Sequence, residues 1–199
     1  MATRLRLDIL PQPDETTCGP TSLHAVYRYY NDEMPLSKVI DQITELETGG
    51  TLAVMLAIHA LKRGYTARLY TYNLHIFDPT WFDGEEARPN LPERLRRQAE
   101  LKTAPKLRRA TESYLEYLAL GGILRFRDLN ADLIRRHLKV GRPILTGLSA
   151  TYLYHCAREI PETNQYDDVV GQPAGHFVVL AGYNKLTRQV LIADPLGDN

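Results

Sequence analysis

The types and order of a few residues in this sequence could support acyl chemistry through a thiol. Cys18 lies between Thr17 and Gly19, at the point where a helix is predicted to begin. The unpaired N–H groups and the dipole at a helix N-terminus stabilise negative charge, which favours a thiolate there. Because the thiolate is the nucleophilic form of cysteine, Cys18 is the candidate nucleophile. The simpler alternative is a small buried cysteine at a helix start.

A candidate base lies in a predicted C-terminal hairpin. Two apolar runs, the first opening at His176 and the second closing at Asp194, are predicted to pair as strands around a turn at 184–187. If Tyr183 pairs with Arg188, His176 and Asp194 share the open end of the hairpin, and a slip of one residue places them directly opposite. A carboxylate fixes the tautomer and orientation of a neighbouring imidazole. We therefore expect His176 to act as the general base and Asp194 to orient it, the alternative being that both merely mark strand ends.

Acyl chemistry also requires a donor for the oxyanion of the intermediate. Gln12 precedes Cys18 by six residues on a proline-stiffened loop. Its side-chain amide could donate a hydrogen bond alongside the backbone N–H of Cys18. Taken alone, Gln12 would be interpreted as a solvated loop residue, so its assignment depends on the other three positions.

Three stretches carry a resemblance to a known family: QPDETTCGPTS at 12–22, GHFVVLAGY at 175–183 and ADP at 193–195. They resemble the papain-like cysteine peptidases, and most of all the bacteriocin-processing branch, family thirty-nine of the cysteine peptidases, whose members cut after double-glycine leaders. The resemblance implies these roles: nucleophile Cys18, general base His176, orienting residue Asp194 and oxyanion donor Gln12.

The resemblance also implies a fold, in which the nucleophile begins a central helix that packs on a small C-terminal antiparallel sheet. The element pattern agrees, because helices come first and antiparallel strands last without βα alternation, which favours the α+β class. Residues 1–199 are predicted to form a single papain-like peptidase domain with a charged helical insertion at about 77–120. Asn199 follows soon after Asp194, so further elements of such a domain could lie beyond this sequence.

The remaining pattern predicts the elements that must position these residues. Alternating Leu5, Leu7 and Ile9 predict a strand or extended lead-in, and Thr17 is the predicted N-cap of the nucleophile helix. Glycines at 49–50 and 121–122 are interpreted as helix boundaries rather than cleavage sites, with Thr51 as a cap. Helices are predicted near 18–30, 36–43, 52–59, 93–120 and 129–138, strands near 65–72 and 143–148, and loops at 77–92 and 157–174.

Several other polar stretches of the sequence are more simply interpreted as structural than as functional. Seven basic residues against three acidic ones at 93–112 predict a solvated helix face, the alternative being a docking surface for an acidic peptide. His155 and Cys156 are sequence neighbours whose side chains point apart, and together with His176 they lack zinc-ligand spacing. Cys156 is therefore predicted to be structural. Acidic residues in the loop before His176 could overhang the site: Glu159, Glu162, Asp167 and Asp168.

The amino-acid composition excludes several classes of protein. The chain has 199 residues, zero formal net charge and 44% hydrophobic residues, which is typical of a globular protein and excludes a disordered tail or a dedicated nucleic-acid binder. Two cysteines exclude a disulfide-stapled scaffold and a four-cysteine zinc module. With no signal peptide or long apolar run, a soluble cytoplasmic protein with free thiols is expected, a Cys18–Cys156 disulfide being the alternative.

These observations together predict a cysteine peptidase that cleaves a peptide or amide bond through a thioester. An acyl or peptidyl transferase using the same site and a non-catalytic peptide-binding domain stay open as alternatives. No metal or cofactor is expected. The predicted partner is a peptide or protein substrate, with an acidic or glycine-rich segment, and neither nucleic acid nor a membrane span is expected.

Overall fold

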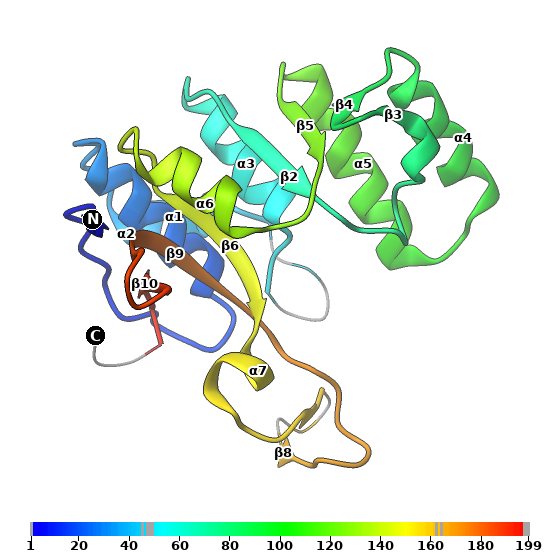
Figure 1. Cartoon of the computed structure of the whole chain (residues 1–199). Helices are drawn as coiled ribbons and strands as arrows, with labels where there is room; N and C mark the ends of the chain where they lie inside the picture. Colours follow the sequence, from blue (N-terminus) through cyan, green and yellow to red (C-terminus); the bar gives the residue numbers. More distant parts are fainter. Residues whose placement is uncertain (1, 45, 47–49, 162, 164, 197–199) are drawn as a thin grey trace. The chain divides into compact units, whose positions relative to one another are not determined.

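The computed structural model describes residues 2–44, 46, 50–161, 163 and 165–196 (Figure 1). The predictions made for Gly49, Glu162 and Asn199 therefore lie outside the described residues. Helices and mainly antiparallel sheets make up the described part, which fits the predicted α+β class. No helix within it has the length and apolar character that crossing a bilayer requires.

The chain divides into two compact units. Unit 1 comprises Met1–Asp41 and Ile134–Asn199, and unit 2 comprises Gln42–Leu133. Unit 1 is therefore built from both ends of the sequence and contains all four predicted site residues. The charged stretch 77–120, which was predicted to be an insertion, lies wholly within unit 2.

The sheet of unit 1 is organised around one long strand, β9 (Gly175–Asn184). Strand β10 (Gln189–Ala193) pairs antiparallel with it along one edge. Strands β6 (Ile144–Ser149) and β1 (Ala2–Arg4) pair antiparallel with successive parts of the other edge. Since β9 has neighbours on both edges, its apolar run is almost continuously buried, as expected of a central strand. The strand alternative predicted for Leu5, Leu7 and Ile9 is wrong in position, because β1 covers Ala2–Arg4; the Leu5 N–H still donates to the Ala181 carbonyl over 2.7 Å.

Helix α1 (Cys18–Tyr29) packs on β9 and begins at the predicted nucleophile. Pro20 is tolerated in its first turn, where a backbone N–H has no intrahelical partner. The helix ends before Asn31, which adopts a left-handed conformation with φ 60°. Thr17 occupies the N-cap position, but its hydroxyl donates to the Asp14 carbonyl instead of capping the helix. The predicted side-chain cap is therefore wrong.

Shorter elements complete this part of the fold. The helices predicted near 36–43 and 129–138 are present as α2 (Leu36–Gln42) and α6 (Ala131–Leu138). The stretch 157–174 is not simply a loop, because it contains a small antiparallel pair. Between β6 and this pair lies a one-turn helix that the sequence did not predict. These additional elements are α7 (Ala150–Tyr154), β7 (Glu159–Ile160) and β8 (Gln165–Tyr166).

Unit 2 combines three helices with a small mixed sheet. Two helices replace the single one predicted at 93–120, because Pro105 starts a new helix after a short break. Leu52 rather than Thr51 is the N-cap of the first helix. The elements are α3 (Ala53–Lys62), β2 (Arg68–Thr71), the 3-10 turn η1 (Pro79–Trp81), β3 (Phe82–Asp83), β4 (Glu86–Ala87), α4 (Leu91–Leu101), α5 (Pro105–Ala119) and β5 (Ile123–Phe126). Strands β2 and β5 are parallel, and the order is β2-β5-β4-β3.

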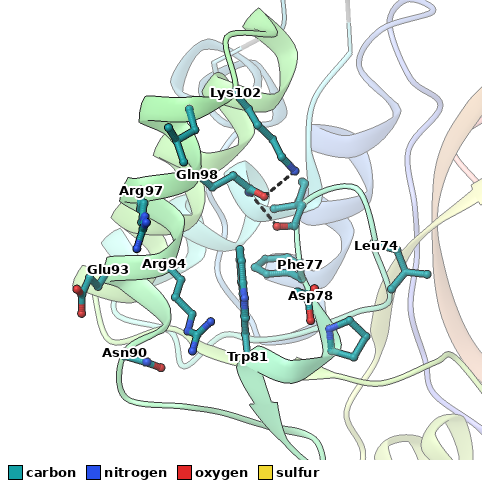
Figure 2. Close-up of a pocket in the computed structure, with 13 residues that line it drawn as sticks. Leu74, Phe77, Asp78, Trp81, Asn90, Glu93, Arg94, Arg97, Gln98 and Lys102 are labelled. Atoms are coloured by element: carbon teal, nitrogen blue, oxygen red, sulfur yellow. Dashed lines mark hydrogen bonds between the residues drawn. The ribbon is translucent and has the colours of Figure 1, made fainter.

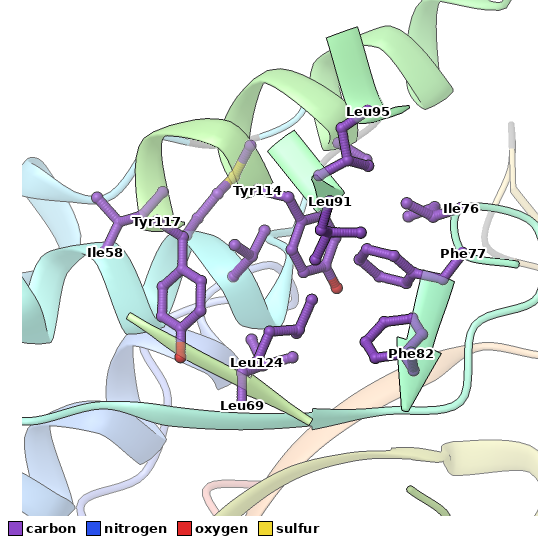
Figure 3. Packing of buried hydrophobic residues seen from close by; sticks show 13 residues of the cluster. Ile58, Leu69, Ile76, Phe77, Phe82, Leu91, Leu95, Tyr114, Tyr117 and Leu124 are labelled. Atoms are coloured by element: carbon purple, nitrogen blue, oxygen red, sulfur yellow. The ribbon is translucent and has the colours of Figure 1, made fainter. Parts of the chain in front are cut away.

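The core of unit 2 is aromatic (Figure 3). Phe77 is 1% exposed and makes edge contacts with Tyr114 and Phe82, with ring centroids 4.7 and 5.9 Å apart. The fully buried Tyr117 has its hydroxyl within hydrogen-bonding distance of the carbonyls of Ala67 and Ile123. The Tyr117 hydroxyl is therefore satisfied by backbone acceptors while its ring packs within the core.

Candidate active site

Cys18 is held at the first position of α1, with 8% of its surface exposed. At this position the N–H groups of Cys18 and Gly19 have no carbonyl of their own helix to bond, because the first turn of every helix lacks such partners. These groups and the helix dipole favour negative charge beside the sulfur. The local geometry therefore suits a thiolate and, next to it, an oxyanion.

His176 is the second residue of β9 and is hydrogen-bonded to Asp194, with Nε2 2.8 Å from Oδ1. The side chains of His176 and Asp194 are 6% and 16% exposed. Since Nε2 is engaged with the carboxylate, Nδ1 is the ring nitrogen left for the thiol. The structure thus brings together the predicted base and its predicted orienting residue.

The charge states of this pair follow from its surroundings. Burial opposes protonation of His176, but hydrogen bonds and charge interactions with the Cys18 and Asp194 side chains outweigh it and raise the His176 pKa. Burial likewise opposes ionisation of Asp194, yet hydrogen bonds from Tyr154, His176 and the Leu196 N–H lower the pKa of its carboxyl. The arrangement therefore favours the protonated form of His176 and the ionised form of Asp194.

The strand register that delivers Asp194 differs from the predicted one. Tyr183 lies opposite Val190, so the predicted pairing of Tyr183 with Arg188 is wrong. A β-bulge between Leu191 and Ile192 then shifts the register by one residue. Because one residue of register changes the face of the sheet, the bulge places Asp194 on the same face as His176. Without the bulge, the carboxylate would point to the opposite face.

Two further contacts join the start of α1 to the strand ends. The Ser22 hydroxyl donates to the Phe177 carbonyl over 3.0 Å, which ties α1 to the residue after the candidate base. The backbone N–H of Gln12 donates to the Pro195 carbonyl over 2.9 Å. The loop before the nucleophile is thereby fastened next to Asp194.

The side chain of Gln12 is engaged differently from the prediction. Its Nε2 donates to the Asp14 carbonyl over 2.7 Å, and its Oε1 is buried without a hydrogen-bond partner among the described residues. One N–H of the amide group is therefore committed to its own loop. The second N–H is the one that would serve an oxyanion.

Tyr154 is a site residue that the sequence did not reveal. Its hydroxyl donates to Oδ2 of Asp194 over 2.5 Å, and its ring centroid lies 5.9 Å from that of His176. Tyr154 ends the unpredicted helix α7 and is separated from Asp194 by forty residues. No sequence pattern around either residue indicates that contact, so it could not be predicted from the sequence.

The neighbouring thiol has a structural environment. Cys156 is partly exposed, and its sulfur lies 3.8 Å from the Ala150 carbonyl within the same turn. His155 adopts a left-handed conformation with φ 51° and turns the chain after α7. Neither residue forms the local thiol–imidazole pair considered from the sequence.

Unit 2 contains a separate hollow of about 750 Å³ between the turn at 74–81 and α4 (Figure 2). Phe77 and Trp81 form an aromatic wall, and the cationic side chains of Arg94, Arg97 and Lys102 line it together with Asp78 and Glu93. Gln98 donates to the Ile76 carbonyl over 2.9 Å and accepts from Lys102 over 3.0 Å, which fixes one side of the hollow. Part of the basic stretch at 93–112 therefore borders a concave surface.

Comparisons with known proteins point in the direction of the sequence resemblance. Residues 103–199 match the family model described as Peptidase_C39 like family. That stretch contains β6, β9 and β10 with His176 and Asp194, whereas Cys18 and Gln12 precede it. No curated protein and no solved structure matches the chain significantly. Over its second half, therefore, the chain resembles the C39-like peptidases.

Proposed function

We propose that this protein is a cysteine peptidase that cleaves a peptide or amide bond through a thioester. The observation that carries the proposal is the position of His176, which hydrogen-bonds Asp194 through Nε2 and interacts with the Cys18 side chain. A thiol, an imidazole and a carboxylate in this order are the parts that nucleophilic acyl transfer requires. The resemblance of residues 103–199 to C39-like peptidases supports the same reaction class.

In the acylation step, the Cys18 sulfur attacks the substrate carbonyl carbon, and the thiol proton resides on His176 Nδ1. The resulting oxyanion accepts hydrogen bonds from the Cys18 backbone N–H and the free N–H of the Gln12 amide. The C–N bond then breaks as His176 gives its proton to the leaving amine, which leaves a thioester on Cys18. Water, deprotonated by His176, attacks the thioester and releases a carboxylic acid and the free thiol.

The electrostatics of the site favour this sequence of steps. A raised His176 pKa favours the protonated imidazole beside the sulfur, and the N-terminus of α1 favours negative charge on the thiol, as an imidazolium–thiolate pair requires. Asp194, whose carboxyl pKa is lowered, stays ionised and orients the ring throughout.

The two cysteines provide a matched test. Iodoacetamide should alkylate Cys18 faster than Cys156, although Cys18 is the more buried of the two. Cys18→Ala should abolish hydrolysis of a peptide library, lowering kcat by at least about 10³-fold, whereas Cys156→Ala should leave it unchanged. Equal alkylation rates, or hydrolysis that survives Cys18→Ala, would rule out the proposal.

A transferase would use the same thioester but deliver the acyl group to an amine. Incubation with a cleaved peptide and candidate amines, followed by mass spectrometry, separates the two activities by product mass. A non-catalytic peptide-binding domain would bind the same peptides and form no thioester. Mass spectrometry of acid-quenched protein would then show no acyl adduct on Cys18.

We further propose that the substrate is a protein or peptide with an acidic segment and that the hollow in unit 2 binds this segment. Arg94, Arg97 and Lys102 offer three cations beside apolar wall residues, a combination that suits acidic peptides with hydrophobic side chains. The reducing cytoplasm is the compartment we propose, because a catalytic thiol must stay reduced to act.

A further inference from the structure

Both oxygens of the Asp194 carboxylate are hydrogen-bonded. Oδ1 lies 2.8 Å from Nε2 of His176 and also accepts from the Leu196 N–H over 2.9 Å. Oδ2 accepts from the Tyr154 hydroxyl over 2.5 Å. A carboxylate held at one oxygen alone can rotate about its bond to Cβ, whereas one held at both oxygens has a fixed plane.

The ring of Tyr154 is also a neighbour of the imidazole. The two ring centroids are 5.9 Å apart, and the ring planes are tilted by 55°. The His176 side chain is 6% exposed, so little water reaches the ion pair beside the tyrosine ring. Low access of water strengthens the hydrogen bonds made by the pair.

The fold holds Tyr154 through α7, the one-turn helix that directly follows β6 (Figure 1). Ser149 caps this helix by accepting a hydrogen bond from the Tyr152 N–H over 3.3 Å. The Ala150 N–H donates to the Ala174 carbonyl over 2.9 Å, which ties the helix to the residue before β9. His155, in its left-handed conformation, then turns the chain away, so that Tyr154 is the last side chain of the turn.

We propose that Tyr154 is a positioning residue that fixes the plane of the Asp194 carboxylate and, through it, the orientation of His176. This inference rests on the proposed peptidase function for its catalytic meaning. Tyr154 does not touch the scissile bond in this role. It acts by holding the Asp194 carboxylate in one orientation. The imidazole of His176 then has one strongly preferred orientation, which sets the direction of its Nδ1 atom.

Protonation of the hydroxyl supports the role. Burial, together with the hydrogen bond to Asp194 and the negative charge of its carboxylate, raises the pKa of Tyr154. The hydroxyl therefore keeps its proton at every pH at which a peptidase of this type would work. Tyr154 is a permanent donor, whereas a histidine in its place would change charge near neutral pH.

The test compares Tyr154→Phe with Tyr152→Phe in the full chain. Tyr152 lies on the same short helix and is 81% exposed, so its variant is a matched control. Tyr154→Phe removes only the hydroxyl from a residue that is 39% exposed, and the fold should survive. We expect kcat to fall roughly tenfold with KM unchanged, and the acid limb of the pH profile to move to higher pH as Asp194 loses a donor.

A second readout does not depend on activity. In a Cys18→Ala background, the proton on His176 Nε2 should give a slowly exchanging NMR signal that broadens in Tyr154→Phe and not in Tyr152→Phe. An unchanged signal would overturn the positioning role, as would an unchanged kcat and acid limb. If the wild-type protein cleaves no peptide while the signal still broadens, the peptidase proposal fails and the positioning of His176 by Tyr154 stands. A lowered melting temperature with an unmoved acid limb would assign Tyr154 a purely structural role.

Discussion

The two units bury polar groups in different ways. In unit 1, the buried polar side chains lie at the start of α1, along it, and on β9: Thr17, Thr21, Ser22, His24 and His176. In unit 2, buried Thr111 and Ser113 donate to carbonyls of their own helix, one turn earlier. Ser22 of unit 1 therefore bonds a different element, whereas Thr111 and Ser113 of unit 2 bond their own helix; buried His59 of unit 2 lies 3.1 Å from the side chain of Gln42 at the end of α2.

The two units also differ in the free-energy cost of their buried polar atoms. A buried polar atom without a partner destabilises a fold by about 1–3 kcal/mol. Four such atoms occur among the described residues, and all of them belong to unit 1: Gln12 Oε1, Thr21 Oγ1, His24 Nδ1 and Thr151 Oγ1. Departures from polar satisfaction are expected at functional sites, which agrees with the position of the candidate catalytic residues in unit 1.

The largest expected effect is on the scaffold of unit 2. Phe77→Ala should lower the free energy of unfolding of this unit by about 3–5 kcal/mol, because it removes a fully buried ring from an aromatic cluster. Hydrogen exchange of α5 amides would report the loss. Cys18 should keep its alkylation rate under native conditions, and a slower rate would break the division of roles between the units.

Two buried serines test the comparison more directly. Ser22→Ala removes the hydrogen bond from α1 to the Phe177 carbonyl and should cost about 1–3 kcal/mol in chemical denaturation. Ser113→Ala is the control, and it should be nearly neutral because that hydroxyl only supplements a helical hydrogen bond. Alkylation of Cys18 should slow in Ser22→Ala alone. Equal costs in the two variants would contradict the difference between the units.

Two buried histidines of unit 1 should titrate in opposite directions. Burial and the nearby Arg28 charge lower the pKa of His24, whereas the thiol and Asp194 raise that of His176. Protonated His176 therefore stabilises the folded protein below its unfolded pKa of about 6.5, and this contribution is lost as pH rises through the higher folded value. His24 instead destabilises the fold as pH falls below about 6.5.

NMR titration of the ring protons measures both values in one experiment. In Cys18→Ala, the His176 pKa should move down because one of its causes is removed, while that of His24 should not change. An unshifted His176 in the wild-type protein would contradict the imidazolium–thiolate pair.

The smallest expected effect concerns the hollow of unit 2. Arg97→Glu should weaken binding of a fluorescent acidic peptide a few-fold, since an exposed charge contributes about 0.2–1 kcal/mol. Arg96→Glu on the same helix carries the same charge change away from the lining residues and should bind normally. The defect should shrink in high salt. Equal weakening by both variants would identify a diffuse charge effect in place of a site.

Much of the framework could be predicted from periodicity. The start of α1 at Cys18 and the strands that open at His176 and close before Asp194 follow from apolar spacing and turn residues. The register could not be predicted, because the bulge between Leu191 and Ile192 depends on how β9 meets its other neighbours. Parallel pairing of β2 with β5 is likewise a property of packing rather than of either strand.

The candidate site, like the fold, could be predicted from the sequence only in part. Residue types and order indicated His176 and Asp194 as neighbours, and the structure places them in hydrogen-bond contact. The roles of Cys18, His176, Asp194 and Gln12 in catalysis remain predictions. Tyr154 lay beyond sequence reasoning because a short helix with no apolar periodicity delivers it.

The composition of unit 1 from both ends of the chain has a consequence for synthesis. Helix α1 and the Gln12 loop leave the ribosome before unit 2, whereas their partners β9 and Pro195 are translated after it. Unit 2 is contiguous in the sequence, so its aromatic core can form before β9, the strand on which α1 packs, has been synthesised. The thiol, imidazole and carboxylate of the candidate site can therefore come together only after unit 2 and the strands β9 and β10 have been synthesised.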